Sequence, residues 1–219
     1  MIPLGDASRR PVNFPIVTTF IIVVNVLVFV SELMGGDAFV NKWSMIPIDI
    51  ISGKNWITLL TSMFMHASWS HILGNMIFLW AFGPELEDAM GPIRYLAFYI
   101  IGGVVAMLTQ LAADPHSTIP NLGASGAIAA VMGGFLMTYP RDRIRTILIF
   151  GWFAKTTFIP AALLIVLWFV IQLFSVGAIA DSEQGGIAFL AHVGGTIYGV
   201  ITARLFERWK PIAAPADYD

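Results

Sequence analysis

The chain has 219 residues, of which 57% are hydrophobic and 12% are charged, with 12 basic and 14 acidic side chains. Soluble domains carry about 25% charged residues, and a soluble domain of this length could not keep so many apolar side chains away from water. The composition therefore excludes a nucleic-acid-binding protein, a disordered scaffold and an ordinary soluble enzyme. The chain has no cysteine, which excludes disulfides, thiolate nucleophiles and cysteine metal sites.

Six apolar runs follow one another along the chain, and each is compatible with a membrane-spanning helix, which needs about 20 mainly apolar residues. They cover residues 16–33, 71–82 with apolar residues before them, 95–113, 123–139, 158–180 and 185–206. We expect the second run to end at Gly83-Pro84 and the fourth at Pro140, because proline interrupts a helix. The stretch 144–153 is too short to span and is expected at the membrane interface or beneath the bundle. The runs predict an all-α polytopic membrane protein, a six-transmembrane-helix bundle with one domain over residues 1–219 and short tails at about 1–13 and 207–219.

The basic residues predict the orientation of these spans. With the N-terminus in the cytoplasm, ten of the twelve lysines and arginines fall on the inside, and only Lys42 and Lys54 fall outside. Such an excess of basic residues marks the cytoplasmic side of a membrane protein. We therefore expect both termini in the cytoplasm, with the protein in the cell (plasma) membrane.

His192 interrupts the sixth run, about seven residues after its start. An unpaired polar group in hydrocarbon is costly, so the imidazole needs either a structural hydrogen bond or a function. Gly195 and Gly199 follow it with the spacing that lets another helix approach closely. Helix packing alone explains these glycines, and a functional histidine at this position would require the same packing.

Ser125 stands near the start of the fourth run, in Gly123-Ala124-Ser125-Gly126. The 17 residues of that run would extend about 25 Å as a helix, less than the bilayer core of about 30 Å. We therefore expect the helix to begin below the membrane surface, with Ser125 in its first turn at a depth similar to that of His192. Glycine and serine are common packing residues in membrane helices, but the recessed serine and histidine together favour a serine nucleophile, with the free N–H groups of the first turn available to an oxyanion.

His71 and Asn75 share one face of the second run, because they are four residues apart. Both could donate hydrogen bonds to a carbonyl oxygen held between spans, although Asn75 could equally join helices. His66 and His71 do not form a zinc site by their pattern, since the segment lacks His-Glu-x-x-His and any acidic residue. We expect no metal and no cofactor.

These segments together resemble the rhomboid family of intramembrane serine proteases, over essentially the whole chain. The resemblance is carried by His66-x4-His71-x3-Asn75, Gly123-Ala124-Ser125-Gly126, Ala191-His192-x2-Gly195-x3-Gly199 and Glu85-x5-Gly91-Pro-x-Arg94-Tyr95. Each motif alone is weak, but the ordered set is specific.

The resemblance implies a role for each motif. Ser125 would be the nucleophile and His192 its general base, while His71, Asn75 and the Ser125 backbone N–H would form the oxyanion hole. His66 would support the first outer loop, and Gly123, Gly126, Gly195 and Gly199 would support the site. No carboxylate lies in the fourth or sixth run to orient His192, which predicts a Ser/His dyad without a third member.

Two departures from the family pattern concern the surroundings of the site. Some relatives have an aromatic residue one turn after the nucleophile, on which the histidine stacks, whereas this chain has Ala129. His192 must then be positioned by its glycines or by another ring. The Trp-Arg pair of some relatives' first outer loop is not evident, since Ile57 follows Trp56. In the fifth run, four residues near the outer half either gate substrate entry or form a lipid-facing aromatic belt: Trp168, Phe169, Gln172 and Leu173.

The sequence thus predicts a serine endopeptidase that hydrolyses peptide bonds in or near transmembrane segments of membrane proteins. We expect the bilayer and transmembrane substrates as its partners, with no nucleic acid, and the sequence leaves the oligomeric state open. The alternatives are a catalytically silent rhomboid-like protein that binds membrane clients and a transporter or channel. The first would be expected to lack the serine or the histidine, and the second is disfavoured by the absence of internal repeats and of charged residues inside the spans.

Overall fold

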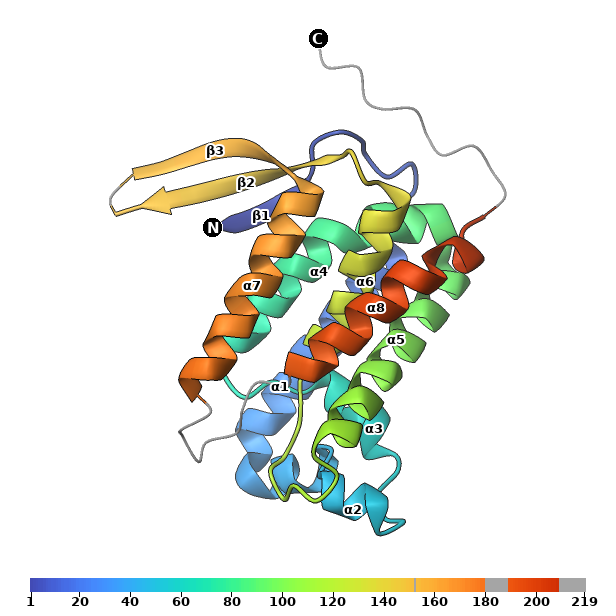
Figure 1. The fold of residues 1–219 in the computed structure, drawn as a ribbon, viewed down its shortest axis with the longest axis vertical. Helices are drawn as coiled ribbons and strands as arrows, with labels where there is room; N and C mark the ends of the chain where they lie inside the picture. Colours follow the sequence, from blue (N-terminus) through green and yellow to red (C-terminus); the bar gives the residue numbers. More distant parts are fainter. Residues whose placement is uncertain (152, 180–188, 209–219) are drawn as a thin grey trace.

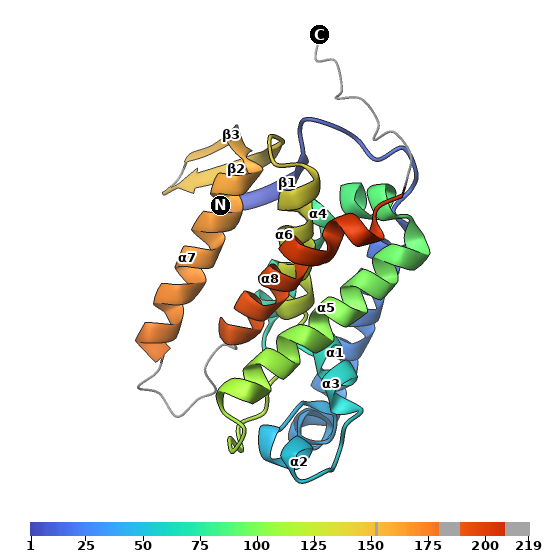
Figure 2. The same cartoon turned by 45° about the vertical axis from the view of Figure 1, so that its right-hand side comes forward.

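The computed structural model describes residues 1–151, 153–179 and 189–208, and helices dominate this part of the chain (Figure 1). The helices are α1 (Ile16–Trp43), α2 (Pro47–Ile51), α3 (Thr58–Thr61), α4 (Trp69–Met90), α5 (Pro92–Ala113), α6 (Ser125–Thr138), α7 (Ala161–Ile179) and α8 (Phe189–Phe206), with a 3-10 turn at Ser62–Phe64. Strands β1 (Ile2–Asp6), β2 (Arg143–Phe150) and β3 (Phe153–Pro160) form one antiparallel sheet in the order β1-β2-β3. The sheet lies at one end of the helical bundle and α2 at the other, in both views (Figures 1 and 2).

Helix α6 is the centre of the bundle. It contacts α4, α5 and α8, and its residues 126–135 are all buried. Its sequence SGAIAAVMGGFLMT is rich in small side chains, which allow neighbouring helices to approach on several sides. Helix α7 lies at the edge of the bundle (Figures 1 and 2). It buries Leu164 and Ile165 but leaves Leu163 and Val166 exposed.

Helices α6 and α8 approach each other so closely that the contact requires glycine. A Cβ added to Gly195 would overlap the carbonyl oxygen of Gly126, and a Cβ added to Gly199 would overlap the carbonyl oxygen of Ala130. The two glycines of α8 thus lie on a backbone-to-backbone contact, the kind of helix packing that their spacing predicts.

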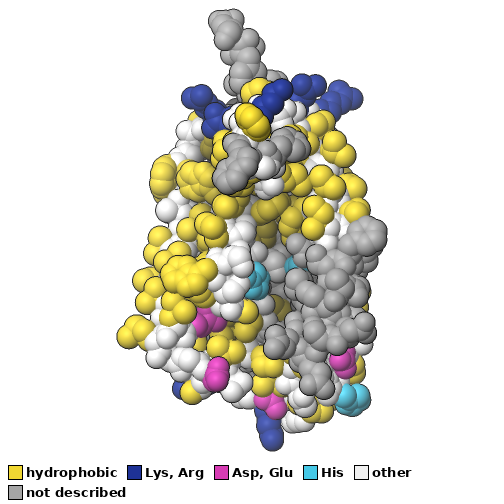
Figure 3. Space-filling model, turned by 90° about the vertical axis from the view of Figure 1, so that its left-hand side faces the viewer, with side chains coloured by type: hydrophobic (Ala, Val, Ile, Leu, Met, Phe, Trp, Pro, Cys, Tyr) yellow, Lys and Arg dark blue, Asp and Glu magenta, His cyan; other side chains and the backbone are white. Residues whose placement is uncertain are grey.

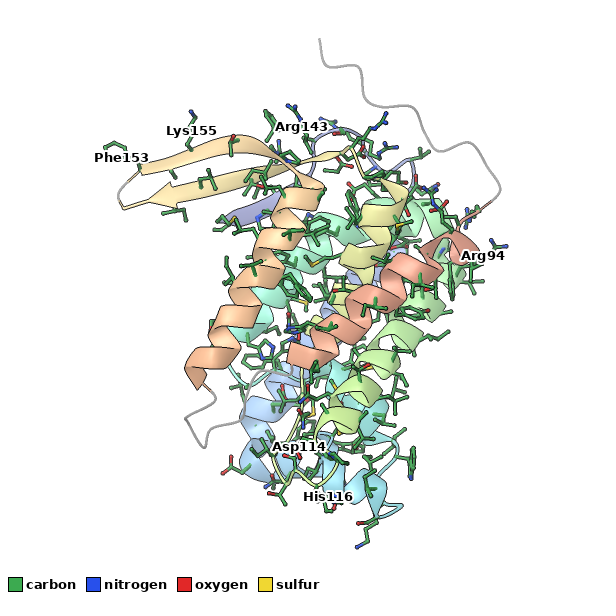
Figure 4. All side chains as sticks on the ribbon, viewed as in Figure 1. Arg94, Asp114, His116, Arg143, Phe153 and Lys155 are labelled. Carbon is green, nitrogen blue, oxygen red and sulfur yellow. The ribbon has the colours of Figure 1, made fainter. Side chains whose placement is uncertain are left out.

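Charged side chains gather toward the ends of the bundle, with mainly hydrophobic side chains between them (Figure 3). Arg94, Arg143 and Lys155 lie at the end that carries the sheet, called the basic end below, whereas Asp114 and His116 lie at the opposite end (Figure 4). This is the separation of charge on which the predicted orientation depends.

Among the described residues, α1 and α5 are long and apolar enough to cross a membrane, with mean hydropathies of 2.4 and 1.9 over 18 residues. Helix α6 and the segment Ala161–Ile171 of α7 are apolar but shorter. The six predicted runs correspond in order to α1, α4, α5, α6, α7 and α8.

Several predicted helix limits are wrong. Helix α4 does not end at Gly83-Pro84 but continues through the buried Pro84 to Met90. Helix α1 continues past residue 33 to Trp43, with a kink at Gly36, where φ is 55°. The fifth run was expected to start at residue 158, yet α7 starts at Ala161 because the preceding residues belong to β3. Residue 180 and residues 185–188 of the predicted runs lie outside the described residues.

The prediction of an all-α fold also needs correction, because the stretch 144–153 forms β2 and the start of a β-hairpin. Residues of β2 pair in register with β3, from Arg143 opposite Pro160 to Phe150 opposite Phe153. β-Branched and aromatic residues are frequent in both strands and favour this conformation. The first residues of the chain add β1 to the other edge of β2. Residues 143–150 are therefore a paired strand at the basic end, outside the helices of the bundle.

The acidic patch after Pro84 holds the N-terminal segment against the bundle. The Glu87 carboxylate accepts hydrogen bonds from the backbone N–H groups of Val17 (2.9 Å) and Thr18 (2.8 Å) and from the Thr18 hydroxyl (2.8 Å). The first turn of a helix leaves such N–H groups without a partner inside the helix, so Glu87 caps α1. Asp88 accepts a further hydrogen bond from the backbone N–H of Val12 (3.1 Å).

A buried cluster of charges joins β1 to the segment between α6 and β2. Arg9 donates hydrogen bonds to both carboxylate oxygens of Asp142, and its guanidinium carbon lies 4.1 Å from the centre of the Tyr139 ring. The side chain of Asp6 is fully buried beside this pair, with its Oδ2 3.7 Å from Arg9 Nε. Burial, together with the neighbouring carboxylate of Asp142, raises the pKa of Asp6 from its ordinary 3.8 to about 7.

This raised pKa predicts that stability falls as the pH rises. The native chain keeps a proton on Asp6 that the unfolded chain releases between about pH 4 and 7, so the free energy of unfolding decreases through that window. In Asp6→Asn the side chain is neutral at every pH, and we expect its melting temperature in detergent to change less between about pH 4.5 and 7.5 than that of the wild type. Asp37→Asn, at an exposed position far along α1, should retain the wild-type slope. Equal slopes for all three proteins would contradict the prediction.

The contact between α6 and α8 predicts that Gly195→Ala destabilises the fold. The added methyl would meet the backbone of Gly126, which cannot move aside as a side chain can. Overpacking of this kind costs about 1–3 kcal/mol, measurable as a loss of free energy of unfolding in mixed detergent micelles. The matched control is Gly74→Ala in α4, where an added Cβ would have no neighbour within 4 Å. The same substitution there should be neutral or stabilising, since alanine favours a helix more than glycine does. A similar effect at both sites would refute the close-packing argument.

Candidate active site

Ser125 and His192 lie side by side at the starts of two adjacent helices. The Nε2 atom of His192 is 2.7 Å from the Oγ of Ser125, within hydrogen-bond distance. Ser125 is the first residue of α6, and His192 follows shortly after Phe189, where the described part of α8 begins. The prediction that His192 lies about seven residues into its run counts from residues 185–188, which lie outside the described residues; His192 lies in the first described turn of α8. The two first turns meet because the helices pack at Gly126 and Gly195.

His192 is buried, and among the described residues its imidazole has one hydrogen-bond partner, Ser125. His192 is 2% exposed and Ser125 is half-buried. Among the described residues, Nδ1 of His192 has no hydrogen-bond partner, so no described carboxylate orients the ring from behind. A neutral imidazole whose Nε2 faces a hydroxyl can take the proton of that hydroxyl, which is the step that activates a serine nucleophile.

The loop before α6 is fixed by backbone hydrogen bonds, and these set the position of Ser125. Met45 and Asn121 exchange two backbone hydrogen bonds, of 3.0 and 2.8 Å, and the N–H of Gly123 donates to the carbonyl of Ser62 (2.9 Å). Gly123 has φ of 140°, a conformation that favours glycine. The chain therefore turns sharply into α6 at the residue pair before the serine.

His71 lies across Gly123 from Ser125. A Cβ added to Gly123 would be 3.0 Å from Cε1 of His71, 3.1 Å from its Nε2 and 3.5 Å from Oγ of Ser125. The imidazole of His71 and the serine hydroxyl thus flank the same glycine, and only glycine leaves the space between them open. Ser68 begins α4 by accepting a hydrogen bond from the backbone N–H of His71 (3.2 Å), which fixes the start of the helix that carries this histidine.

Asn75 lies one turn further along α4 and is 8% exposed. Its Nδ2 has no hydrogen-bond partner among the described residues. A buried amide donor without a partner is costly, and a substrate oxygen would satisfy it. The interpretation of Asn75 as a link between helices would need a partner for this donor.

His66 lies on the far side of His71, behind the site. Its ring centre is 5.0 Å from that of His71 and 6.5 Å from that of Phe29. Its backbone N–H donates to both carboxylate oxygens of Glu32, at 3.1 and 3.0 Å. His66 therefore ties α1 to the segment before α4 and contacts the ring of His71, with no contact to Ser125 among those observed.

The ring that sequence reasoning could not identify beside His192 is Trp168 of α7. The centres of the two rings are 5.2 Å apart and their planes are inclined by 52°. Ala129, where some relatives have an aromatic residue, is fully buried in α6. The sequence contains only indirect indications of this contact. No aromatic residue follows Ser125 by one turn to stack on His192, and the run before the one that carries His192 contains Trp168.

Two further predictions concern the side chains of the fifth run and the absence of a metal site. The side chains of Gln172 and Leu173 fall outside the described part of the chain. Within the described residues, no group of three histidine, aspartate or glutamate side chains is arranged to hold a metal ion.

The hydroxyl of Ser125 and Nε2 of His192 lie within hydrogen-bond distance of each other, and the imidazole of His71 lies on the other side of Gly123. The first N–H groups of α6 have no partner inside the helix. A hydroxyl, an imidazole and nearby N–H donors are the groups that acyl transfer through an oxyanion would require.

Known proteins are similar to this chain over most of its length. A model of the rhomboid domain matches residues 53–209. Rhomboid protein 1, mitochondrial, of Saccharomyces cerevisiae is 28% identical over 183 residues, covering 81% of this chain and 49% of that protein. Rhomboid-like protein 11, chloroplastic, of Arabidopsis thaliana is 25% identical over 170 residues, covering 74% of this chain and 56% of that protein.

A bacterial relative, Rhomboid protease GluP of Bacillus subtilis, is 27% identical over 195 residues, covering 86% of this chain and 34% of that protein. The chain thus spans between about a third and just over half of the length of these three relatives. The matched domain includes all the motif residues from His66 to Gly199, in the order that the resemblance requires. The chain belongs to the rhomboid family and is a helical integral membrane protein.

Proposed function

We propose that this chain is an intramembrane serine protease in which Ser125 is the nucleophile and His192 the general base. The observation that carries the proposal is the 2.7 Å approach of His192 Nε2 to Ser125 Oγ across two helices that pack through glycine. Family membership makes protease chemistry the expected use of such a pair.

The reaction would follow the usual course of a serine hydrolase. Ser125 attacks the carbonyl carbon of the scissile bond as its proton moves to His192, and the imidazolium then protonates the leaving amine. Water, activated by the neutral His192, hydrolyses the acyl-enzyme. His71, Asn75 and the backbone N–H of Ser125 would hold the oxyanion, which gives the unpartnered amide of Asn75 a purpose.

The proposed membrane topology uses the six long helices. We propose that α1, α4, α5, α6, α7 and α8 each cross the bilayer as one domain, with the basic end in the cytoplasm. This orientation is supported by the position of Arg94, Arg143 and Lys155 at the same end as the sheet (Figure 4). The relatives named above include mitochondrial, chloroplastic and bacterial proteins, so residence in the plasma membrane stays a prediction from the sequence.

The proposed substrates are transmembrane proteins. A carbonyl inside a helix is already hydrogen-bonded, so a substrate helix must unwind before Ser125 can reach it. We therefore expect cleavage where a transmembrane segment has glycine, proline or polar residues close to the end of the bilayer opposite the basic end. By resemblance to the family, we also expect a small residue before the scissile bond.

The direct test of the nucleophile is labelling with a fluorophosphonate probe together with cleavage of a transmembrane reporter. The wild-type protein in detergent should be labelled and should cleave the reporter. Ser125→Ala should abolish both, because the attacking oxygen is gone, and His192→Ala should lower both by at least about a thousandfold, because the serine loses its base. Ser31→Ala, which removes an exposed hydroxyl on α1, is the matched control and should react like the wild type.

Melting temperatures close to that of the wild type would establish that the two inactive variants are folded. Substantial cleavage by folded Ser125→Ala would refute the proposal. A folded wild-type chain that binds the reporter without labelling or cleavage would favour a catalytically silent binder of membrane clients.

The test of the oxyanion hole is Asn75→Ala. If the amide donates to the oxyanion, its loss should raise the activation barrier for kcat by about 2–4 kcal/mol. Some turnover should remain. Asn25→Ala, which removes another buried amide, bonded to the carbonyl of Ile21 at 2.7 Å in α1, is the control and should alter stability but not kcat. Unchanged turnover in Asn75→Ala, with reduced thermal stability, would return this residue to a structural role.

A further inference from the structure

Among the described side chains of α7, Trp168 contacts the proposed dyad. Its ring centre is 5.2 Å from that of His192 and 5.8 Å from that of Phe78 on α4. The indole thus contacts both an aromatic ring of α4 and the imidazole on α8.

The environment of His192 explains why this contact matters. A histidine side chain changes its orientation by rotation about its Cα–Cβ and Cβ–Cγ bonds, and only Nε2 of His192 has a hydrogen-bond partner among the described residues. Ala129, on the same helix as Ser125, carries only a methyl group. Among the contacts observed between described residues, the indole of Trp168 is the aromatic ring that restricts this rotation.

The same contact favours the charged form of the base. When Ser125 is acylated, His192 carries a positive charge for part of the cycle. A cation beside the face of an indole is stabilised by the negative charge density of the ring, most strongly where water is excluded. The 5.2 Å between the ring centres lies within the distance of about 6 Å at which a cation and an aromatic ring attract each other.

We propose that Trp168 is a positioning residue for His192, so that the site is complete only while α7 is docked against α4 and α8. This inference rests on the proposed function. Helix α7 is held mainly along one side, since Leu164 and Ile165 are buried whereas Leu163 and Val166 are 57% and 55% exposed. A displacement of α7 would withdraw the indole from His192 and would lower the reactivity of Ser125 without any change in α6 or α8.

The experiment measures the rate of fluorophosphonate labelling, because this small probe reports the reactivity of Ser125 without requiring entry of a substrate helix. Trp168→Leu should lower the labelling rate and the kcat for a transmembrane reporter by about five- to thirtyfold, with little change in KM. Trp168→Phe keeps a ring next to the imidazole and should restore most of both rates.

The matched control is Trp80→Leu, the same substitution at an exposed tryptophan of α4 that is 45% accessible. It should label like the wild type. Phe78→Leu removes the other aromatic ring that Trp168 contacts and should lower the labelling rate less than Trp168→Leu does.

The outcomes separate this inference from the proposed function. A wild-type chain that is folded but never labelled at Ser125 would refute the proposed function. A labelled wild type with equal labelling of folded Trp168→Leu would refute only the role of Trp168. A raised KM for the reporter with unchanged labelling would also overturn it, and would place the tryptophan in substrate entry. Equal losses in Trp168→Leu and Trp168→Phe, with equal losses of melting temperature, would reduce the contact to packing.

Discussion

The close approach of the α6 and α8 backbones is the contact on which the rest of the site depends. Glycine at positions 195 and 199 allows the two helices to meet without intervening side chains, with Gly195 against the carbonyl oxygen of Gly126. The serine at the start of one helix and the histidine in the first described turn of the other are then brought to 2.7 Å. A single added methyl at this contact would move the helices apart, and a hydrogen bond of this length does not tolerate such a shift. The glycine contact that packs α6 against α8 therefore also sets the distance between Ser125 and His192.

The two ends of the bundle keep this contact in place by different means. At the basic end, polar side chains join the segments: Glu87 caps α1, and Arg9 forms hydrogen bonds with Asp142 beside the buried Asp6. Near the site, the contact is made by aromatic rings, and Trp168 packs against both Phe78 and His192. The first kind of contact is specific and fixed by several hydrogen bonds. The second is a packing contact on a helix at the edge of the bundle, which is why α7 is the element through which the site can be completed or disturbed.

Much of the fold was predictable because hydrophobic runs directly reflect burial in a bilayer or a core. A long helix overlaps each of the six predicted runs, although several of the predicted limits are wrong. The errors have identifiable causes. Pro84 suggests a helix end, but the contacts of Glu87 and Asp88 with the N-terminal segment hold the following turns helical. The stretch 144–153 is a short apolar segment by its sequence. It pairs with residues 153–160 as a hairpin and with residues 2–6, and no local pattern links residues 2–6 to it.

The class of protein, the order of the helices and the identity of the residues proposed to act can all be predicted from the sequence alone. The apolar composition indicates that much of the chain lies in a bilayer. Few polar residues occur inside the apolar runs, and Ser125 and His192 are among them. How these two residues meet, and which side chains surround them, follows from the packing of the helices. The distance between the serine and the histidine, the open space at Gly123 between His71 and Ser125, and the indole of Trp168 beside the imidazole all join residues from different helices. Such contacts depend on how the helices pack, and a one-dimensional pattern does not contain that information.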